Sequence, residues 1–118
     1  MTGLSEHIED TRKITIADRT FEIVVRRFAN GCFVAISEGE GARLGALELS
    51  IKMKNQISSS TIIPPKLSGT FLTMLSEMAA NVTNGIALVS VHLTKEVSAD
   101  IVRNILSETR DILTKQKS

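Results

Sequence analysis

Apolar and polar residues alternate along much of the first half of the chain, a period of two that is typical of β-strands. In residues 12–16, Ile14 and Ile16 point to one side while Lys13 and Thr15 point to the other. Pro64-Pro65 closes the last of these runs, because proline cannot donate a hydrogen bond to a strand ladder. The pattern predicts five successive strands, over residues 12–16, 21–28, 32–37, 47–53 and 57–63.

Two turns join the first three strands. One is expected at Asp18-Arg19, and Asn30-Gly31 is the strongest hairpin signal, because Asn and Gly tolerate the positive φ angles of a type I′ turn. Taking Asn30-Gly31 as a two-residue loop sets the register, and three pairs then share one face of the hairpin: Phe28 with Phe33, Arg26 with Ala35, and Val24 with Ser37. The other face also carries apolar residues: Ile23, Val25, Val34 and Ile36.

The fourth strand shows the clearest alternation in the chain. Its apolar residues alternate with Glu48, Ser50 and Lys52, and we expect the apolar side to face the core: Leu47, Leu49, Ile51 and Met53.

After the prolines the apolar period lengthens to three and four residues, which predicts an amphipathic helix that stops at Asn84-Gly85. An apolar strand over residues 86–93 follows, and Ser98 is expected to cap a final helix. The predicted order is β-β-β-β-β-α-β-α. This is an α+β fold, an antiparallel sheet of about six strands with two helices on one face. Residues 1–11 are expected to fray, and residues 12–115 to form a single domain.

Two helices can cover only one face of such a sheet, yet the hairpin at 21–37 is apolar on both faces. We expect the helices to cover the Ile23/Val25 side and a second protein to cover the other. The alternative is that the N-terminal segment and the long loops close both faces. The residues predicted at a dimer interface are Val24, Arg26, Phe28, Phe33, Ala35 and Ser37.

Composition and charge argue against several classes of function. The chain has 14 Lys and Arg against 13 Asp and Glu, four Phe and no Trp or Tyr, so neither phosphate binding nor base stacking is favoured. Its single cysteine, Cys32, excludes an internal disulfide and a multi-cysteine metal site. Apolar runs are too short to cross a membrane, and we expect no secretory leader. We expect no nucleic-acid or membrane partner, and a cytoplasmic or nuclear location.

Catalytic chemistry has little support in the sequence. The glycines of the segment 39–45 lack the spacing and the following helix of a dinucleotide-binding loop. Ser90 and His92 share a strand face but have no third group to orient a base, and two distant histidines make a poor metal site. We expect no catalytic residues, no cofactor and no metal, and therefore not an enzyme.

Several segments together resemble a known family. They are the strand ending in Phe28, the strand Phe33-Val34-Ala35-Ile36, the loop with Arg43-Leu44-Gly45-Ala46-Leu47, the Ser/Thr-rich run 57–63, and the apolar strand 85–93. Across about residues 12–113 the chain resembles the third and fourth proteasome assembly chaperones. The glycine spacing in the loop leaves open which of the two it resembles more.

The resemblance implies a non-catalytic protein that pairs with itself or a sister chaperone, sheet against sheet, and helps α subunits of the 20S proteasome join into a ring. The loop is the expected partner-binding segment, through Glu38, Glu40, Arg43 and Leu44. Whether the dimer is a homodimer or a heterodimer, and which α subunit is bound, stay open. The alternative is a profilin-like or roadblock-like scaffold domain in a trafficking or GTPase-regulating complex.

Overall fold

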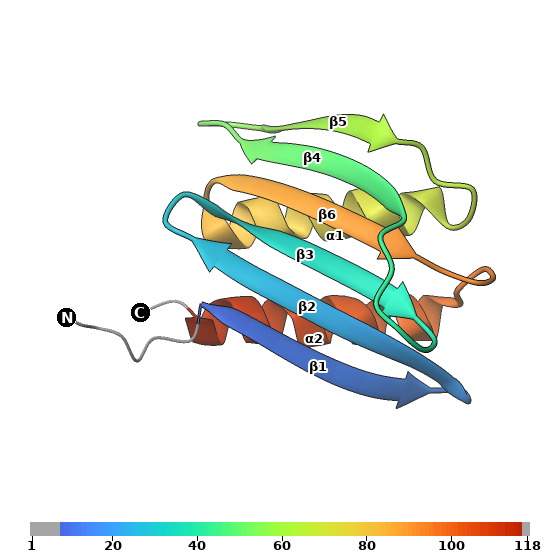
Figure 1. Ribbon diagram of the computed structural model, residues 1–118. Coiled ribbons are helices and arrows are strands. Elements are labelled where there is room, and N and C mark those ends of the chain that lie inside the picture. The colour runs from blue at the N-terminus through green and yellow to red at the C-terminus, as the bar shows by residue number, and fades with distance from the viewer. Residues whose placement is uncertain (1–7, 117–118) are drawn as a thin grey trace.

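Six strands form one sheet, and two helices pack on a single face of it (Figure 1). The computed structural model describes residues 8–116. The elements are β1 (Glu9–Ile16), β2 (Arg19–Phe28), β3 (Gly31–Glu38), β4 (Ala46–Lys52), β5 (Ile57–Ile63), α1 (Gly69–Thr83), β6 (Ile86–His92) and α2 (Ala99–Gln116). This order confirms the predicted α+β class. Residues 1–7 of the segment expected to fray lie outside the described residues, and residues 9–11 already belong to β1.

The strand order across the sheet is β1-β2-β3-β6-β4-β5. Four of the five neighbouring pairs are antiparallel, but β3 and β6 run parallel, so the sheet is mixed rather than antiparallel throughout. Helix α1 connects β5, at the edge of the sheet, to β6. This crossover connection places β6 between β3 and β4, where it runs parallel to β3. The last strand in the sequence therefore lies near the centre of the sheet.

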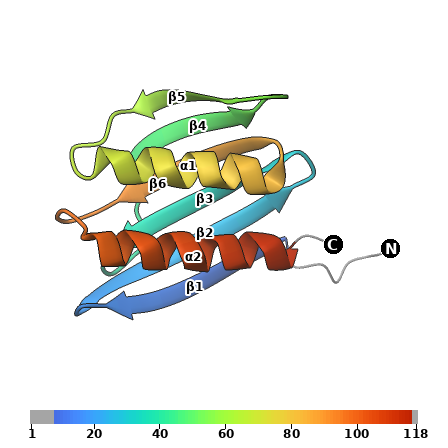
Figure 2. The same cartoon turned by 180° about the vertical axis from the view of Figure 1, so that it is seen from behind.

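The core lies between the sheet and the two helices, which stand in front of the sheet in Figure 2. Ile23, Val25, Val34 and Ile36 are all 0% exposed, which confirms that the helices cover this side of the hairpin. From the helices, the largest fully buried side chains are Phe71, Leu72, Leu75, Ile105, Ile112 and Leu113.

The β2–β3 register differs from the prediction. Ala29 and Asn30 form the turn, Phe28 lies opposite Gly31, and every residue of β2 pairs two places earlier in β3 than predicted. Gly31 serves a close approach between strands, because a Cβ there would lie 1.9 Å from the carbonyl oxygen of Ile86. A shift of two residues keeps every side chain on its predicted face, so the two faces of the hairpin are as expected although the pairs are not.

Other local signals have mixed outcomes. Positive φ angles at Ala17 (51°) and Asp18 (63°) make these two residues the β1–β2 turn, one position before the predicted Asp18-Arg19. Asn84 ends α1 in the left-handed conformation, with φ 54°, as predicted. At the start of α2, the Ile101 amide donates to the Ser98 hydroxyl over 3.3 Å, which confirms the predicted cap.

Strand β4 faces the opposite way from the prediction. Glu48 (3% exposed) and Ser50 (0%) lie beneath α1, while Leu47, Leu49 and Ile51 lie on the side without helices. Burying polar residues is tolerated here because they are hydrogen bonded: the Ser76 hydroxyl donates to the Glu48 carboxylate (2.9 Å) and lies 2.8 Å from the Ser50 hydroxyl. The apolar residues of β4 therefore lengthen the uncovered surface and do not belong to the core.

Candidate interaction surface

The side of the sheet that carries no helix is lined by apolar residues from four adjacent strands. We call this surface the open face, and its apolar residues are Val24, Phe28, Phe33, Ala35, Ile86, Leu88, Leu47, Leu49 and Ile51. The pairing registers place them in continuous rows across the sheet. One row runs through Arg26, Phe33, Leu88, Leu49 and Ser60, from β2 to β5. The centre of the open face therefore lies on β3 and β6, not on the β2–β3 hairpin alone.

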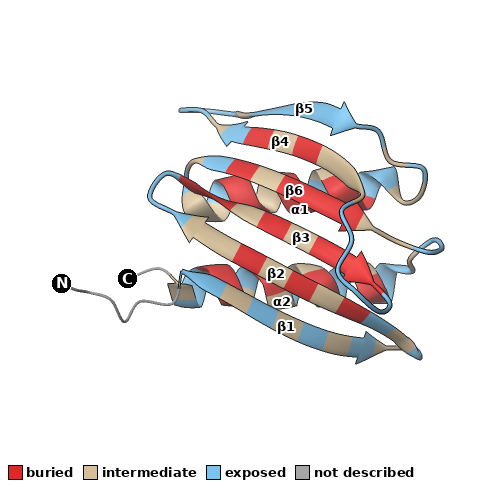
Figure 3. Cartoon of the chain, viewed as in Figure 1, coloured by how far each residue is buried: buried red, intermediate tan, exposed pale blue. Residues whose placement is uncertain are grey.

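The described part of the chain leaves the open face largely uncovered. Phe28 is 48% exposed, Ile86 40% and Ile51 37%, and the other apolar residues of this face are half-buried by their own neighbours in the sheet. In Figure 3 the four central strands carry many buried residues, and those under the helices are among them. A contiguous apolar surface of this kind is typical of a protein–protein contact.

Charged side chains of this face gather at one side, on β1 and β2. Arg26 lies 3.6 Å from the Glu9 carboxylate, and its guanidinium lies 5.3 Å from the centre of the Phe28 ring. Lys13 and Glu22 are a directly opposed pair in the same two strands. The apolar area thus has a charged rim on one flank and the serine residues of β5 on the other, the pattern of an apolar centre with a polar edge.

The segment 39–45 crosses one end of the open face on its way from β3 to β4, as Figure 1 shows. The Arg43 amide donates to the Ser37 hydroxyl and the Gly45 amide to the Ser90 hydroxyl, both over 2.9 Å. Ser37 is therefore only 2% exposed, so it offers little surface to the predicted dimer interface. Val24, Arg26, Phe33 and Ala35 are half-buried, so like the exposed Phe28 they keep surface on this face.

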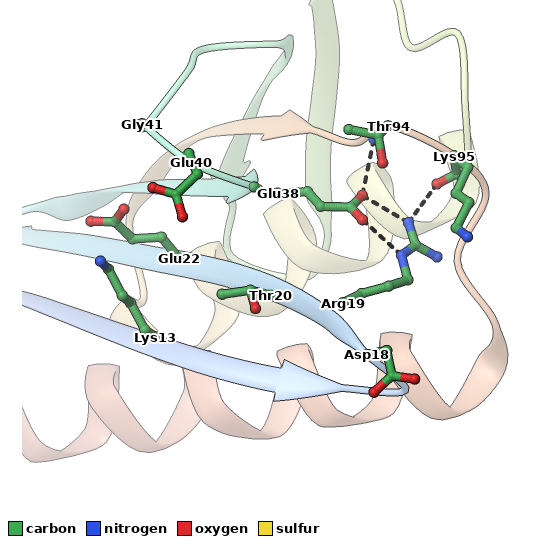
Figure 4. A pocket seen from close by; sticks show the side chains of 11 residues that line it. Lys13, Asp18, Arg19, Thr20, Glu22, Glu38, Glu40, Gly41, Thr94 and Lys95 are labelled. Atoms are coloured by element: carbon green, nitrogen blue, oxygen red, sulfur yellow. Dashed lines mark hydrogen bonds and ion pairs between the residues drawn. The ribbon is translucent and has the colours of Figure 1, made fainter.

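Glu38, predicted in the partner-binding loop, is also buried. It ends β3 at 8% exposure, and its carboxylate accepts two hydrogen bonds of 2.8 Å from Arg19 and one of 2.9 Å from the Thr94 amide. Figure 4 shows these side chains at the end of the sheet, in a cleft with a volume of about 510 Å³. The ion pair with Arg19 lowers the pKa of Glu38 to about 2.

The Arg19–Glu38 pair has a structural role. The Arg19 guanidinium also donates to the carbonyl oxygens of Lys95 (2.9 Å) and Glu96 (2.7 Å), and the Glu96 carboxylate accepts from the Ser68 hydroxyl (2.6 Å). These contacts join the β1–β2 turn region to the β6–α2 loop and to the start of α1. The exposed members of the predicted partner-binding loop are Glu40, Arg43 and Leu44, and Leu44 is 73% exposed.

The residues weighed for chemistry have other roles. Ser90 is 0% exposed and accepts the Gly45 amide, and Cys32 is 5% exposed, with burial raising the pKa of its thiol to about 11. Within residues 8–116, no three His, Cys, Asp or Glu side chains gather as metal ligands would. The helices in this part of the chain are not long and apolar enough to span a membrane.

Sequence reasoning missed five residues of the open face: Leu47, Leu49, Ile51, Ile86 and Leu88. The first three were assigned to the core because alternation shows that two sides differ without showing which side the helices cover. Ile86 and Leu88 belong to a strand expected to be covered on both faces. The Ser/Thr-rich run 57–63 was a signal for the true orientation of β4. Its hydroxyls can form hydrogen bonds with Glu48 and Ser50, which favours placing the polar side of β4 beneath the helix.

Comparison with solved structures finds proteins of similar fold. A chain of a solved chaperone complex for yeast 20S proteasome assembly superposes with a TM-score of 0.69 at 13% sequence identity, over 94% of this chain and 99% of that chain. No protein-family model and no curated protein sequence matches this chain.

This chain has the fold of a 20S proteasome assembly chaperone. The sequence resemblance to that family is therefore supported at the level of the fold, over nearly the whole length of both chains. Because the coverage is almost complete in each direction, the similarity concerns the fold as a whole and not one part of it.

Proposed function

We propose that this protein is a subunit of a chaperone that assembles the 20S proteasome, and that it dimerises through its open face. The observation that carries the proposal is the uncovered apolar surface on β2, β3, β6 and β4, in a chain with the fold of an assembly chaperone. A second sheet packed on this surface would complete a four-layer arrangement of helices, sheet, sheet and helices. The second sheet belongs to an identical copy or to a sister chaperone.

The dimer then binds α-type subunits of the 20S proteasome and promotes their joining into a ring, in the cytoplasm or the nucleus. The exposed residues Glu40, Arg43 and Leu44 support a role for the segment 39–45 in this contact, since they project away from the core at the end of the open face. In this proposal the protein acts by binding and not by catalysis.

The test combines the purified protein with its sister chaperone and with individual 20S α subunits, and measures the mass of each species. We expect the wild-type protein to form a dimer that captures an α subunit, and Phe28→Asp to abolish both dimerisation and capture. The matched control is Leu44→Asp, which changes the loop and leaves the open face intact, so it should dimerise normally and lose only the capture step. Failure of the wild-type protein to capture any α subunit, alone or with the sister, would contradict the proposed role.

A further inference from the structure

The sheet has two outer edges, β1 and β5, which Figure 1 shows at opposite sides of the molecule. An edge strand presents unpaired backbone N–H and C=O groups that another strand can bind. Folded proteins commonly protect such edges with charges, prolines or bulges. The two edges of this sheet differ sharply in how far they are protected.

Strand β1 is a protected edge. Four of its eight residues are charged, and they are Glu9, Asp10, Arg12 and Lys13. Arg12 is also held by α2, through contacts of 2.6 Å to Glu108 and 3.1 Å to Asp111. A further strand added to this edge would have to accommodate charges of both signs along most of its length.

Strand β5 lacks this protection. None of the seven residues Ile57–Ile63 is charged and none is proline, and six of the seven are exposed. In Figure 3 almost the whole strand is coloured as exposed. Its pairing with β4 has an irregularity between Leu47 and Glu48, which leaves a regular free edge from Ile57 to Thr61.

Side-chain hydrogen bonds to β4 and α1 hold β5 in place and leave its outer edge free. The Ser59 hydroxyl lies 2.7 Å from that of Ser50 and donates to Glu77 over 3.1 Å, and the Thr61 hydroxyl donates to Glu48 over 3.2 Å. These bonds tie β5 to β4 and α1 and use none of the outward backbone groups. Little ordering cost therefore remains for a strand that adds to this edge.

We propose that β5 is a second interaction surface, at which two copies of this chain pair their β5 strands antiparallel and join their sheets. The occupant is a second copy because the strand is complementary to itself. Pairing about Ser59 opposes Ile57 with Thr61 and Ser58 with Ser60, so no like charges oppose each other within the two paired strands. The same arrangement at β1 would oppose Arg12 and Lys13.

This contact is separate from the dimer of the proposed function. It uses the backbone at the rim of the sheet and leaves the open face accessible, so the two contacts together produce a tetramer. The contact area of one strand pair is small, so the association is weak and visible only at high protein concentration.

The test uses the Phe28→Asp protein, in which the open face no longer associates, and measures its mass by sedimentation at increasing concentration. We expect a reversible monomer–dimer equilibrium in the range of hundreds of micromolar. Adding Ser60→Lys should abolish this dimer. The matched control is Thr11→Lys, which places the same charge at an exposed position on the same face of the other edge strand, and it should leave the dimer intact.

Hydrogen exchange locates the contact directly. Amide protection in the Phe28→Asp protein should rise with concentration within residues 57–61 and stay constant in β1. A Phe28→Asp protein that is monomeric at every concentration, or equal effects of Ser60→Lys and Thr11→Lys, would overturn the β5 contact and leave the open-face dimer untouched. Conversely, a wild-type protein that dimerises only through β5 would support this contact and contradict the proposed open-face dimer.

Discussion

Leu49 of β4 and Leu88 of β6 lie directly opposite each other on the open face of the sheet. Their neighbours Glu48 and Val89 form the next opposed pair and point toward the helices, at 3% and 0% exposure. Along these two central strands, successive residues thus lie alternately on the open face and in the core. Because the two sides differ in what covers them, substitutions one residue apart should have different consequences.

The first prediction contrasts the two sides of the hairpin. Phe28→Asp should abolish association through the open face and change the melting temperature little, because Phe28 is 48% exposed. Ile36→Asp should cost several kcal/mol of folding free energy, about enough to unfold a marginally stable domain, because it places an unpaired carboxylate in the core. Circular dichroism with thermal melting measures the fold, and sedimentation measures association. Equal loss of fold in both variants would show that the faces are assigned wrongly.

The second prediction concerns β4, where polarity alone is misleading. Ser50→Ala removes hydroxyl contacts of 2.7 Å to Ser59 and 2.8 Å to Ser76, and should lower the free energy of unfolding by about 1–2 kcal/mol without affecting association. Leu49→Ala should weaken association, since it lies on the open face. Denaturant titration and sedimentation of the two variants make the comparison. A Ser50→Ala protein that associates less well than Leu49→Ala would refute this orientation of the strand.

The third prediction is a dependence of stability on pH. The pKa of Glu38 is about 2 in the folded protein, below its ordinary value of 4.5, so the charged form is favoured by folding. Its stabilisation is complete above the unfolded pKa and is lost as the pH falls toward the folded one. This carboxylate should account for a loss of about 3 kcal/mol in unfolding free energy between about pH 5 and about pH 2.

Glu38→Gln supplies the control for this effect. The variant should be less stable at neutral pH, and the difference in unfolding free energy between it and the wild-type protein should shrink as the pH falls. A difference that stays constant over this range would mean that the Arg19–Glu38 ion pair does not set the acid sensitivity.

The fourth prediction concerns the segment that crosses the end of the open face. A Cβ at Gly45 would lie 2.3 Å from the Val91 carbonyl oxygen, so Gly45→Ala should displace the segment and cost about 1–3 kcal/mol. Gly39→Ala meets no atom within 4 Å and should cost less, about 1 kcal/mol, from its positive φ of 91°. Chemical denaturation compares the two variants. If Gly39→Ala lowered the free energy of unfolding more than Gly45→Ala, the close contact at Gly45 would not be what restricts the segment.

Local patterns were sufficient for the element order and for the faces of the hairpin. The alternation around Ile23 and Val34, the helix end at Asn84 and the cap at Ser98 depend on neighbours within a few residues, so the sequence carries them directly. The parallel β3–β6 pair was missed because it depends on where the chain re-enters the sheet after α1. Gly31 was assigned to the turn, although its role is to let Ile86 approach.

The candidate site was predicted only in part, because local patterns indicate some of its residues and contacts between distant segments decide the others. Phe28 and Phe33 follow from the two-faced hairpin, whereas Leu49 was placed in the core because alternation cannot say which side a helix will cover. The burial of Ser37 and Glu38 was not predicted, because the groups that they contact are distant in sequence or unrecognisable locally: the Arg43 amide for Ser37, and Arg19 and the Thr94 amide for Glu38. Contacts between distant segments decide these cases.

The mass of the native protein at low micromolar concentration tests the central claim most directly. The chain has a mass of 12.8 kDa, and the account predicts a species of twice that mass, either for the protein alone or after mixing with its sister chaperone. The Phe28→Asp variant should give only the single-chain mass under both conditions. A wild-type protein that stays at 12.8 kDa, alone and in the mixture, would contradict the claim that the open face is covered by a partner sheet.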